Sequence, residues 1–96
     1  MSAYVISEVT IRDQEAVARY KPVAKRSVLA FGGQYLARDV APETLEGAFA
    51  PDERIVILSF PDTQAARAWY ASDAYAEALS LAGDALDRRL FIVEGA

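Results

Sequence analysis

The chain has 96 residues, of which 53% are hydrophobic and 25% charged, and this composition is typical of a folded domain rather than a disordered chain. Its net charge of −4, with basic residues scattered along the sequence, argues against nucleic-acid binding, which needs a basic surface. The chain has no cysteine and no histidine. This excludes disulfides, thiolate nucleophiles, histidine-ligated haem and Ser-His-Asp triads, and we expect neither a metal nor a cofactor.

The first predicted elements are a strand over 4–11 and a helix that runs to about residue 30. The strand is rich in β-branched and aromatic residues and contains no glycine or proline. Asp13 has the side chain of a helix N-cap, and apolar residues follow it at spacings of three and four: Val17, Tyr20, Ala24, Val28 and Phe31. Because Pro22 interrupts this stripe, we expect either a kink or two short helices.

A second strand is expected over 34–39, after the Gly32-Gly33 pair that ends the helix. Residues 40–53 contain two prolines, one glycine and four acids, which predicts a loop, with a brief strand extension over 44–46. The strand over 54–60 is continuously apolar, which indicates burial on both faces.

Two more helices and a last strand complete the chain. Asp62 and Ser72 are predicted N-caps, the first for a helix over 62–72 and the second for a helix that continues to about residue 86. The last strand is expected over 90–93, flanked by the Arg88-Arg89 pair.

These elements form two β-α-β units, over about 4–38 and 55–94, in a single domain spanning residues 1–96. Right-handed crossovers then give a four-stranded antiparallel sheet with the helices on one face, which is the ferredoxin-like α+β fold.

The uncovered face of that sheet predicts a homodimer. In the strand over 54–60 both sets of alternate residues are apolar, Ile55-Ile57-Ser59 on one face and Val56-Leu58-Phe60 on the other. Because the helices cover one face, a second copy packed on the other face would bury the remaining set. The alternative is an ordinary strand with a few exposed aliphatic residues.

Six motifs in chain order carry a resemblance to a known family. They are AYVISEV over 3–9, Gly32-Gly33-x-Tyr35-Leu36-x-Arg38, Leu45-Glu46-Gly47, Phe60-Pro61-Asp62, the block Ala66-Arg67-Ala68-Trp69-Tyr70-x-Ser72-x-x-Tyr75, and Val93-Glu94-Gly95. Together they resemble the bacterial domain of unknown function number 1330. The resemblance implies a dimeric α/β barrel in which two sheets face each other with the helices outside. Relatives by fold include cofactor-free quinone-forming monooxygenases, muconolactone isomerases and haem-binding peroxidase-like enzymes.

One stretch departs from that family. Its members often carry an arginine in the second half of the last helix, where this chain has Leu81-Ala82-Gly83-Asp84. If that arginine binds an anion in the relatives, this protein has lost it or uses another. The family has no settled activity, so the resemblance implies a fold and leaves the function open.

Five side chains are predicted to bind a ligand: Tyr20, Tyr35, Arg38, Trp69 and Tyr75. The aromatic residues would wall a pocket between helix and sheet, and the alternative for them is core packing. Arg38 would hold a carboxylate or phenolate, and its alternative is a salt bridge to Asp39, Glu46 or an acid of the partner.

Two residues are candidates for catalysis, Glu8 and Tyr35. Glu8 would act as a general base if its carboxylate faces a cavity, and the alternative is a solvated or paired strand residue. Ser72 is interpreted as a helix cap rather than a nucleophile, since no histidine is available to activate it.

Three functions stay open at this point. The first is a homodimer that binds a small aromatic or anionic metabolite in a pocket between sheet and helices. The second is a cofactor-independent enzyme, monooxygenase- or isomerase-like, that acts on an aromatic or enol-type metabolite, and the third is a structural dimerisation module. No secretory signal or apolar run of about 20 residues is recognisable, so we expect a cytoplasmic protein with no membrane partner.

Overall fold

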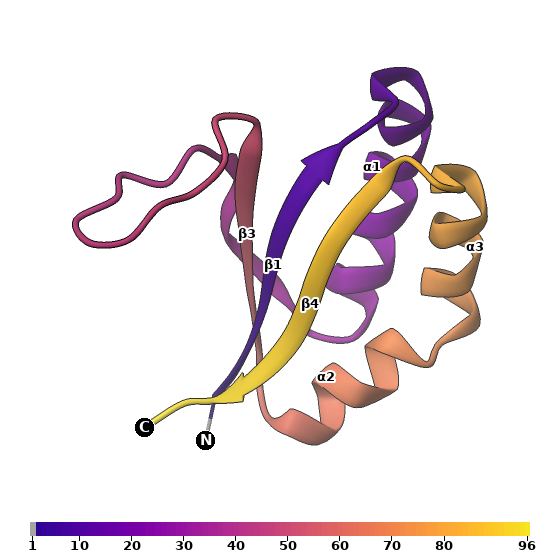
Figure 1. Ribbon diagram of the computed structural model, residues 1–96. Coiled ribbons are helices and arrows are strands. Elements are labelled where there is room, and N and C mark those ends of the chain that lie inside the picture. The colour runs from indigo at the N-terminus through magenta and orange to yellow at the C-terminus, as the bar shows by residue number, and fades with distance from the viewer. Residues whose placement is uncertain (1) are drawn as a thin grey trace.

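The computed structural model describes residues 2–96 and confirms the predicted β-α-β-β-α-β order, with the second helical segment divided in two (Figure 1). The elements are β1 (Ala3–Ile11), α1 (Gln14–Ala30), β2 (Gln34–Val40), β3 (Glu53–Phe60), α2 (Thr63–Tyr70), α3 (Asp73–Ala82) and β4 (Leu86–Glu94). The strands form one antiparallel sheet in the order β2-β3-β1-β4, with the helices on one side of it. Within residues 2–96, no helix combines the length and the apolar composition needed to cross a membrane.

Side-chain caps set where the three helices begin. The carboxylate of Asp13 accepts hydrogen bonds from the backbone amides of Glu15 and Ala16, at 3.0 and 3.2 Å, and so starts α1. Asp62 starts α2 and Ser72 starts α3 in the same way, as the sequence predicted. Each cap satisfies an amide that the first turn of a helix leaves without a partner.

Several boundaries differ from the predicted ones. α1 is one continuous helix with Pro22 inside it, not two short helices, because a proline removes one hydrogen bond and the packed stripe supports the remaining turns. The segment 44–46 lies in the loop between β2 and β3 and forms no strand. α3 stops before Gly83, whose φ of 55° suits a glycine after a helix, and β4 therefore begins earlier, at Leu86.

Trp69 and Tyr75 lie at the centre of the core between sheet and helices. Their ring centres are 4.2 Å apart, and the Trp69 ring packs on Phe60 at 5.4 Å. The indole N–H of Trp69 donates to the hydroxyl of Ser27 at 3.0 Å, and that hydroxyl donates to the carbonyl of Ala24. The hydrogen bonds tie α2 to α1 and fix the orientation of the indole.

Alternate residues of each strand point to opposite faces of the sheet. The face away from the helices, which we call the open face, carries no helix in Figure 1. Apolar residues form its central rows: Tyr4, Ile6, Ile55, Ile57, Phe91 and Val93. Phe91 and Val93 are 37% and 41% exposed, and Ile55 and Ile57 are half-buried. The prediction that β3 is buried on both faces is therefore wrong for a single chain, because nothing in that chain covers the second face.

Gly33, between α1 and β2, has no room for a side chain. A methyl group on its Cα would lie 2.7 Å from Cε1 of Phe60 and 2.7 Å from Cγ1 of Val28. We expect Gly33→Ala to lower the free energy of unfolding by about 1–3 kcal/mol in urea denaturation, because the core must shift to accept it. The control Gln34→Ala, at the exposed next position, should change it by less than about 0.5 kcal/mol. Equal losses in the two variants would contradict the packing argument.

Candidate functional site

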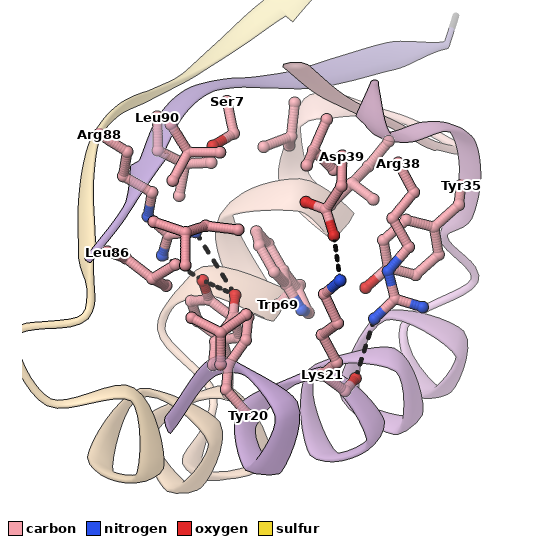
Figure 2. A pocket seen from close by; sticks show the side chains of 17 residues that line it. Ser7, Tyr20, Lys21, Tyr35, Arg38, Asp39, Trp69, Leu86, Arg88 and Leu90 are labelled. Carbon is pink, nitrogen blue, oxygen red and sulfur yellow. Dashed lines mark hydrogen bonds and ion pairs between the residues drawn. The ribbon is translucent and has the colours of Figure 1, made fainter. Parts of the chain in front are cut away.

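A cavity of about 50 Å³, which we call the chamber, lies between the sheet and the helices (Figure 2). All five residues predicted to bind a ligand line it: Tyr20, Tyr35, Arg38, Trp69 and Tyr75. Further polar side chains line it too: Ser7, Lys21, Asp39 and Arg88. The volume suits a few water molecules or the charged end of a small metabolite.

At one end of the chamber, Arg88 of β4 contacts two tyrosines. Its guanidinium donates to the hydroxyl of Tyr75 on α3 at 2.5 Å and to the hydroxyl of Tyr20 on α1 at 3.4 Å. The two hydroxyls are 2.8 Å apart and share a hydrogen bond. One side chain of the sheet thus connects two helices, as the dashed lines of Figure 2 show.

At the other end, irregularities of β2 turn three of its side chains toward the chamber. The pairing of β2 with β3 shifts between Tyr35 and Ala37 and again between Ala37 and Val40. Such bulges add a residue to one strand and redirect the side chains beside it. Strict alternation would separate Tyr35 from Arg38, yet both line the chamber, together with Asp39. Asp39 has a φ of 53°, a left-handed conformation that aspartate tolerates better than most residues.

These β2 side chains reach across to α1. The guanidinium of Arg38 lies 4.5 Å from the ring centre of Tyr35, a cation–π contact, and donates to the backbone carbonyl of Lys21 at 3.1 Å. The carboxylate of Asp39 pairs with the ammonium of Lys21. Within residues 2–96, Arg38 therefore does not form the salt bridge considered as its alternative, since the neighbouring acid is bound to the lysine.

Burial sets the protonation state of the charged and phenolic groups. It raises the pKa of Tyr75 well above its usual value, and Tyr20 raises it further against the opposing effect of Arg88. Burial also raises the pKa of Tyr35, whereas Arg38 lowers it. Burial lowers the pKa of Arg88, but the two tyrosine oxygens raise it by more. At neutral pH, Tyr35 and Tyr75 are thus neutral and Arg88 is charged.

The chamber contains more hydrogen-bond donors than acceptors. A hydroxyl supplies one proton, so the bond between Tyr20 and Tyr75 uses one of two phenolic protons, while Arg88 already donates to both oxygens. The second phenolic proton has no acceptor in this cluster. Ser7 is 2% exposed, and its hydroxyl has no hydrogen-bond partner within the described chain. Buried donors of this kind normally have a partner, so the arrangement favours an acceptor from outside the protein.

The net charge of the chamber also favours an anionic ligand. Lys21, Arg38 and Arg88 line it with Asp39, a net charge of +2. Asp39 pairs with Lys21, and among residues 2–96 no carboxylate pairs with Arg88. Arg88 is half-buried, and a cation that is partly removed from water without a counter-ion loses hydration, so a small anion would be stabilised here. In the same part of the chain, no group of three or more acidic residues gathers where it could hold a metal ion.

Sequence reasoning missed Ser7, Lys21, Asp39 and Arg88 as chamber residues. For Arg88 the available signal was alternation, because it lies two positions before Leu90 and pairs with Val9 on the helix side of the sheet. A last strand predicted to begin at residue 86 instead of 90 would have placed it there. Arg88 also supplies the chamber with an arginine, which the last helix lacks over 81–84.

The two predicted catalytic residues lie on different faces of the sheet. Glu8 is on the open face, where its carboxylate accepts hydrogen bonds from Arg89 at 2.5 and 3.0 Å. It is a paired strand residue and cannot act as a base in the chamber of its own chain. Tyr35 lines the chamber, and its catalytic role stays a prediction.

Comparison with solved structures gives several similar folds. The first is RPA0582, a protein of unknown function from Rhodopseudomonas palustris, with 19% identity and a TM-score of 0.79 over 99% of this chain and 82% of that one. SnoaB, a cofactor-independent oxygenase from Streptomyces nogalater, has 13% identity and a TM-score of 0.63 over 99% and 93%. A dimeric ferredoxin-like protein of unknown function from Thermobifida fusca has 14% identity and a TM-score of 0.64 over 99% and 92%. At these identities the likeness shows the fold.

None of the curated proteins matches this sequence. Residues 2–96 do match the family described as a domain of unknown function, DUF1330, which covers the six motifs from β1 to the end of β4. The chain therefore belongs to the DUF1330 family, as those motifs predicted.

Proposed function

We propose that this protein is a homodimer that binds a small anionic metabolite in the chamber. The observation that carries the proposal is Arg88, a half-buried guanidinium with two hydroxyl partners and, among residues 2–96, no carboxylate partner. An anion beside it would supply the missing counter-charge. The same anion would accept from Ser7 and from the free phenolic proton, and each such charge-assisted hydrogen bond contributes about 1.5–3 kcal/mol.

A carboxylate or an enolate is the anion best supported. Its two oxygens match the fork of a guanidinium, and it is small enough for a chamber of about 50 Å³. The ring of Trp69, fixed by its hydrogen bond to Ser27, provides a flat wall beside it.

The homodimer is supported by the open face and by a structural neighbour. The Thermobifida fusca protein is described as dimeric, and its fold matches 99% of this chain. The apolar rows of the open face are half-buried or exposed here, and covering such side chains gains about 1 kcal/mol or more for each. A cytoplasmic location stays a prediction.

A cofactor-independent enzyme is the second candidate. SnoaB, which shares the fold, is described as a cofactor-independent oxygenase. Within the chamber, Asp39 could serve as a base beside donors that would stabilise an enolate. Turnover of an enol-type substrate that disappears in Asp39→Asn would favour this candidate, whereas binding without turnover favours the first.

Removal of the Arg88 charge tests the proposed site. We expect Arg88→Gln to raise the Kd of acetate by about 10- to 100-fold, because a charge-assisted hydrogen bond and the counter-charge are lost. Quenching of Trp69, the single tryptophan, measures the Kd. Arg19→Gln, which removes the same charge at an exposed position of α1, is the matched control. Wild-type affinity in Arg88→Gln would refute the site.

Ser7→Ala is a second test of the anion site, in a variant whose fold should not be weakened. This change removes a buried hydroxyl that has no partner in the described chain, so the free energy of unfolding should stay the same or rise. The Kd of acetate should nevertheless increase at least about tenfold, because a donor to the anion is lost.

We expect the carboxylate of Asp39 to compete with the ligand for Lys21. Its carboxylate pairs with Lys21, so Asp39→Asn should free the lysine and tighten acetate binding by about 3- to 10-fold. Asparagine tolerates the left-handed conformation as aspartate does, so backbone strain stays constant in this comparison. Weaker binding in Asp39→Asn would show that the carboxylate supports the ligand instead of competing with it.

A charged residue at the centre of the open face tests whether this face is the dimer interface. Ile57→Lys should convert a species of twice 10.5 kDa into one of 10.5 kDa in light scattering coupled to size exclusion, because an unpaired lysine would be buried between the sheets. Leu29→Lys, at a position of α1 that is 55% exposed, should leave the mass unchanged. A wild-type protein that is a monomer at micromolar concentration would contradict the homodimer.

A further inference from the structure

A second hollow adjoins the chamber on its α2 side. This groove, about 300 Å³ in volume, lies between α2 and β4 and is lined by Val5, Ala66, Arg67, Trp69, Tyr70, Leu90, Phe91 and Ile92. Apart from Arg67 its lining is apolar or aromatic. Tyr70 and Ile92 are 54% and 38% exposed, so the groove is open to solvent at its outer side.

Three side chains belong to both hollows: Val5, Trp69 and Leu90. Trp69 is held by its indole hydrogen bond to Ser27 and by its contact with Phe60. Val5 is short and lies 2% exposed in the central strand. Leu90 is half-buried, ends in an aliphatic group without a polar anchor, and is therefore the side chain of the three most able to change rotamer.

We infer that the chamber and the groove form one bipartite site for a carboxylate that carries an aryl or short alkyl body. The inference depends on the proposed function, because it takes the chamber as the place of the carboxylate. A chamber of about 50 Å³ has no room for the rest of a metabolite, and the groove is the adjoining space. A cavity of about 150 Å³ holds a benzene ring, so the groove is large enough for the body.

The division of chemistry between the two hollows follows their linings. Donors and a net positive charge gather in the chamber, while the groove offers the faces of Trp69 and Tyr70 and the aliphatic side chain of Ile92. A carboxylate placed in the groove could pair only with Arg67, which is exposed and so contributes little, and it would not gain the donors of Ser7 and Arg88. The ligand is thus expected to enter with its carboxylate toward Arg88 and its body against Trp69, with Leu90 turned aside.

Affinities of acetate and phenylacetate, measured by amide shifts in NMR titrations of the full chain, test this inference. Acetate has the carboxylate without the body, so phenylacetate should bind at least about 30-fold more tightly. Ile92→Trp fills the groove from an exposed position. It should bring the affinity of phenylacetate to within about threefold of acetate while leaving acetate unchanged. Leu29→Trp, at an exposed position of α1 that lines neither hollow and lies away from the open face, is the control and should change neither affinity.

The outcomes separate the two proposals. If neither anion shifts any amide in the wild-type chain, the anion site itself is wrong. If acetate binds and phenylacetate gains nothing, or if the gain survives Ile92→Trp, the anion site stands and the bipartite site is overturned. A change of oligomeric mass in Ile92→Trp with unchanged phenylacetate affinity would assign the groove to a second copy and would also overturn it.

A second measurement covers the case in which Ile92→Trp does not fold. In the wild-type complex, the ring protons of phenylacetate should give nuclear Overhauser contacts to the methyl groups of Ala66 and Ile92, which line the groove and not the chamber. Contacts to Val9 and Val17 of the chamber instead would overturn the inference.

Discussion

The guanidinium of Arg88 is half-buried on the helix side of the sheet and is held by two tyrosine hydroxyls instead of a carboxylate. This contact connects β4 to α1 and α3, and it fixes one end of the chamber. Neutral hydroxyls satisfy the geometry of the guanidinium but not its charge. Burial raises the pKa of Tyr75 and keeps this phenol protonated, so it adds a donor where an anion would be needed. The proposed function follows from this cation, whose hydrogen-bonding groups have partners while its charge has none.

The two faces of the sheet differ in what they carry. The helix face carries the chamber and the groove, with Trp69 as the wall between them. The open face carries apolar rows and, at one end, the ion pair of Glu8 with Arg89. Figure 1 shows the loop over 41–52 extending away from the helices, on the side of the open face, with Leu45 92% exposed. The proposed dimer interface and the proposed ligand site thus use largely different side chains of the same strands, with Phe91 of the edge strand β4 bordering both.

Much of the fold follows from local patterns in the sequence. Asp13, Asp62 and Ser72 are visible as caps because their chemistry acts within one turn, and the sheet order follows from two crossovers of one hand. The five predicted ligand residues line one cavity because three come from the helices and two from β2, on the two sides of the space between helices and sheet. The sequence could not show that Arg38 lies on the helix side of the sheet, since the bulges of β2 depend on its pairing with β3. The contact of Arg88 with Tyr20 and Tyr75 could not be predicted either, because it joins three different elements of the fold.

The guanidinium resonances of Arg88 test the central claim most directly. In a nitrogen-15 labelled protein at constant ionic strength, we expect a saturable shift of the Arg88 side-chain N–H signals on titration with acetate, while those of exposed Arg19 stay in place. Ser7→Ala should require more acetate to reach the same shift. Arg88 signals that do not move, or that move no more than those of Arg19, would contradict an anion site in the chamber.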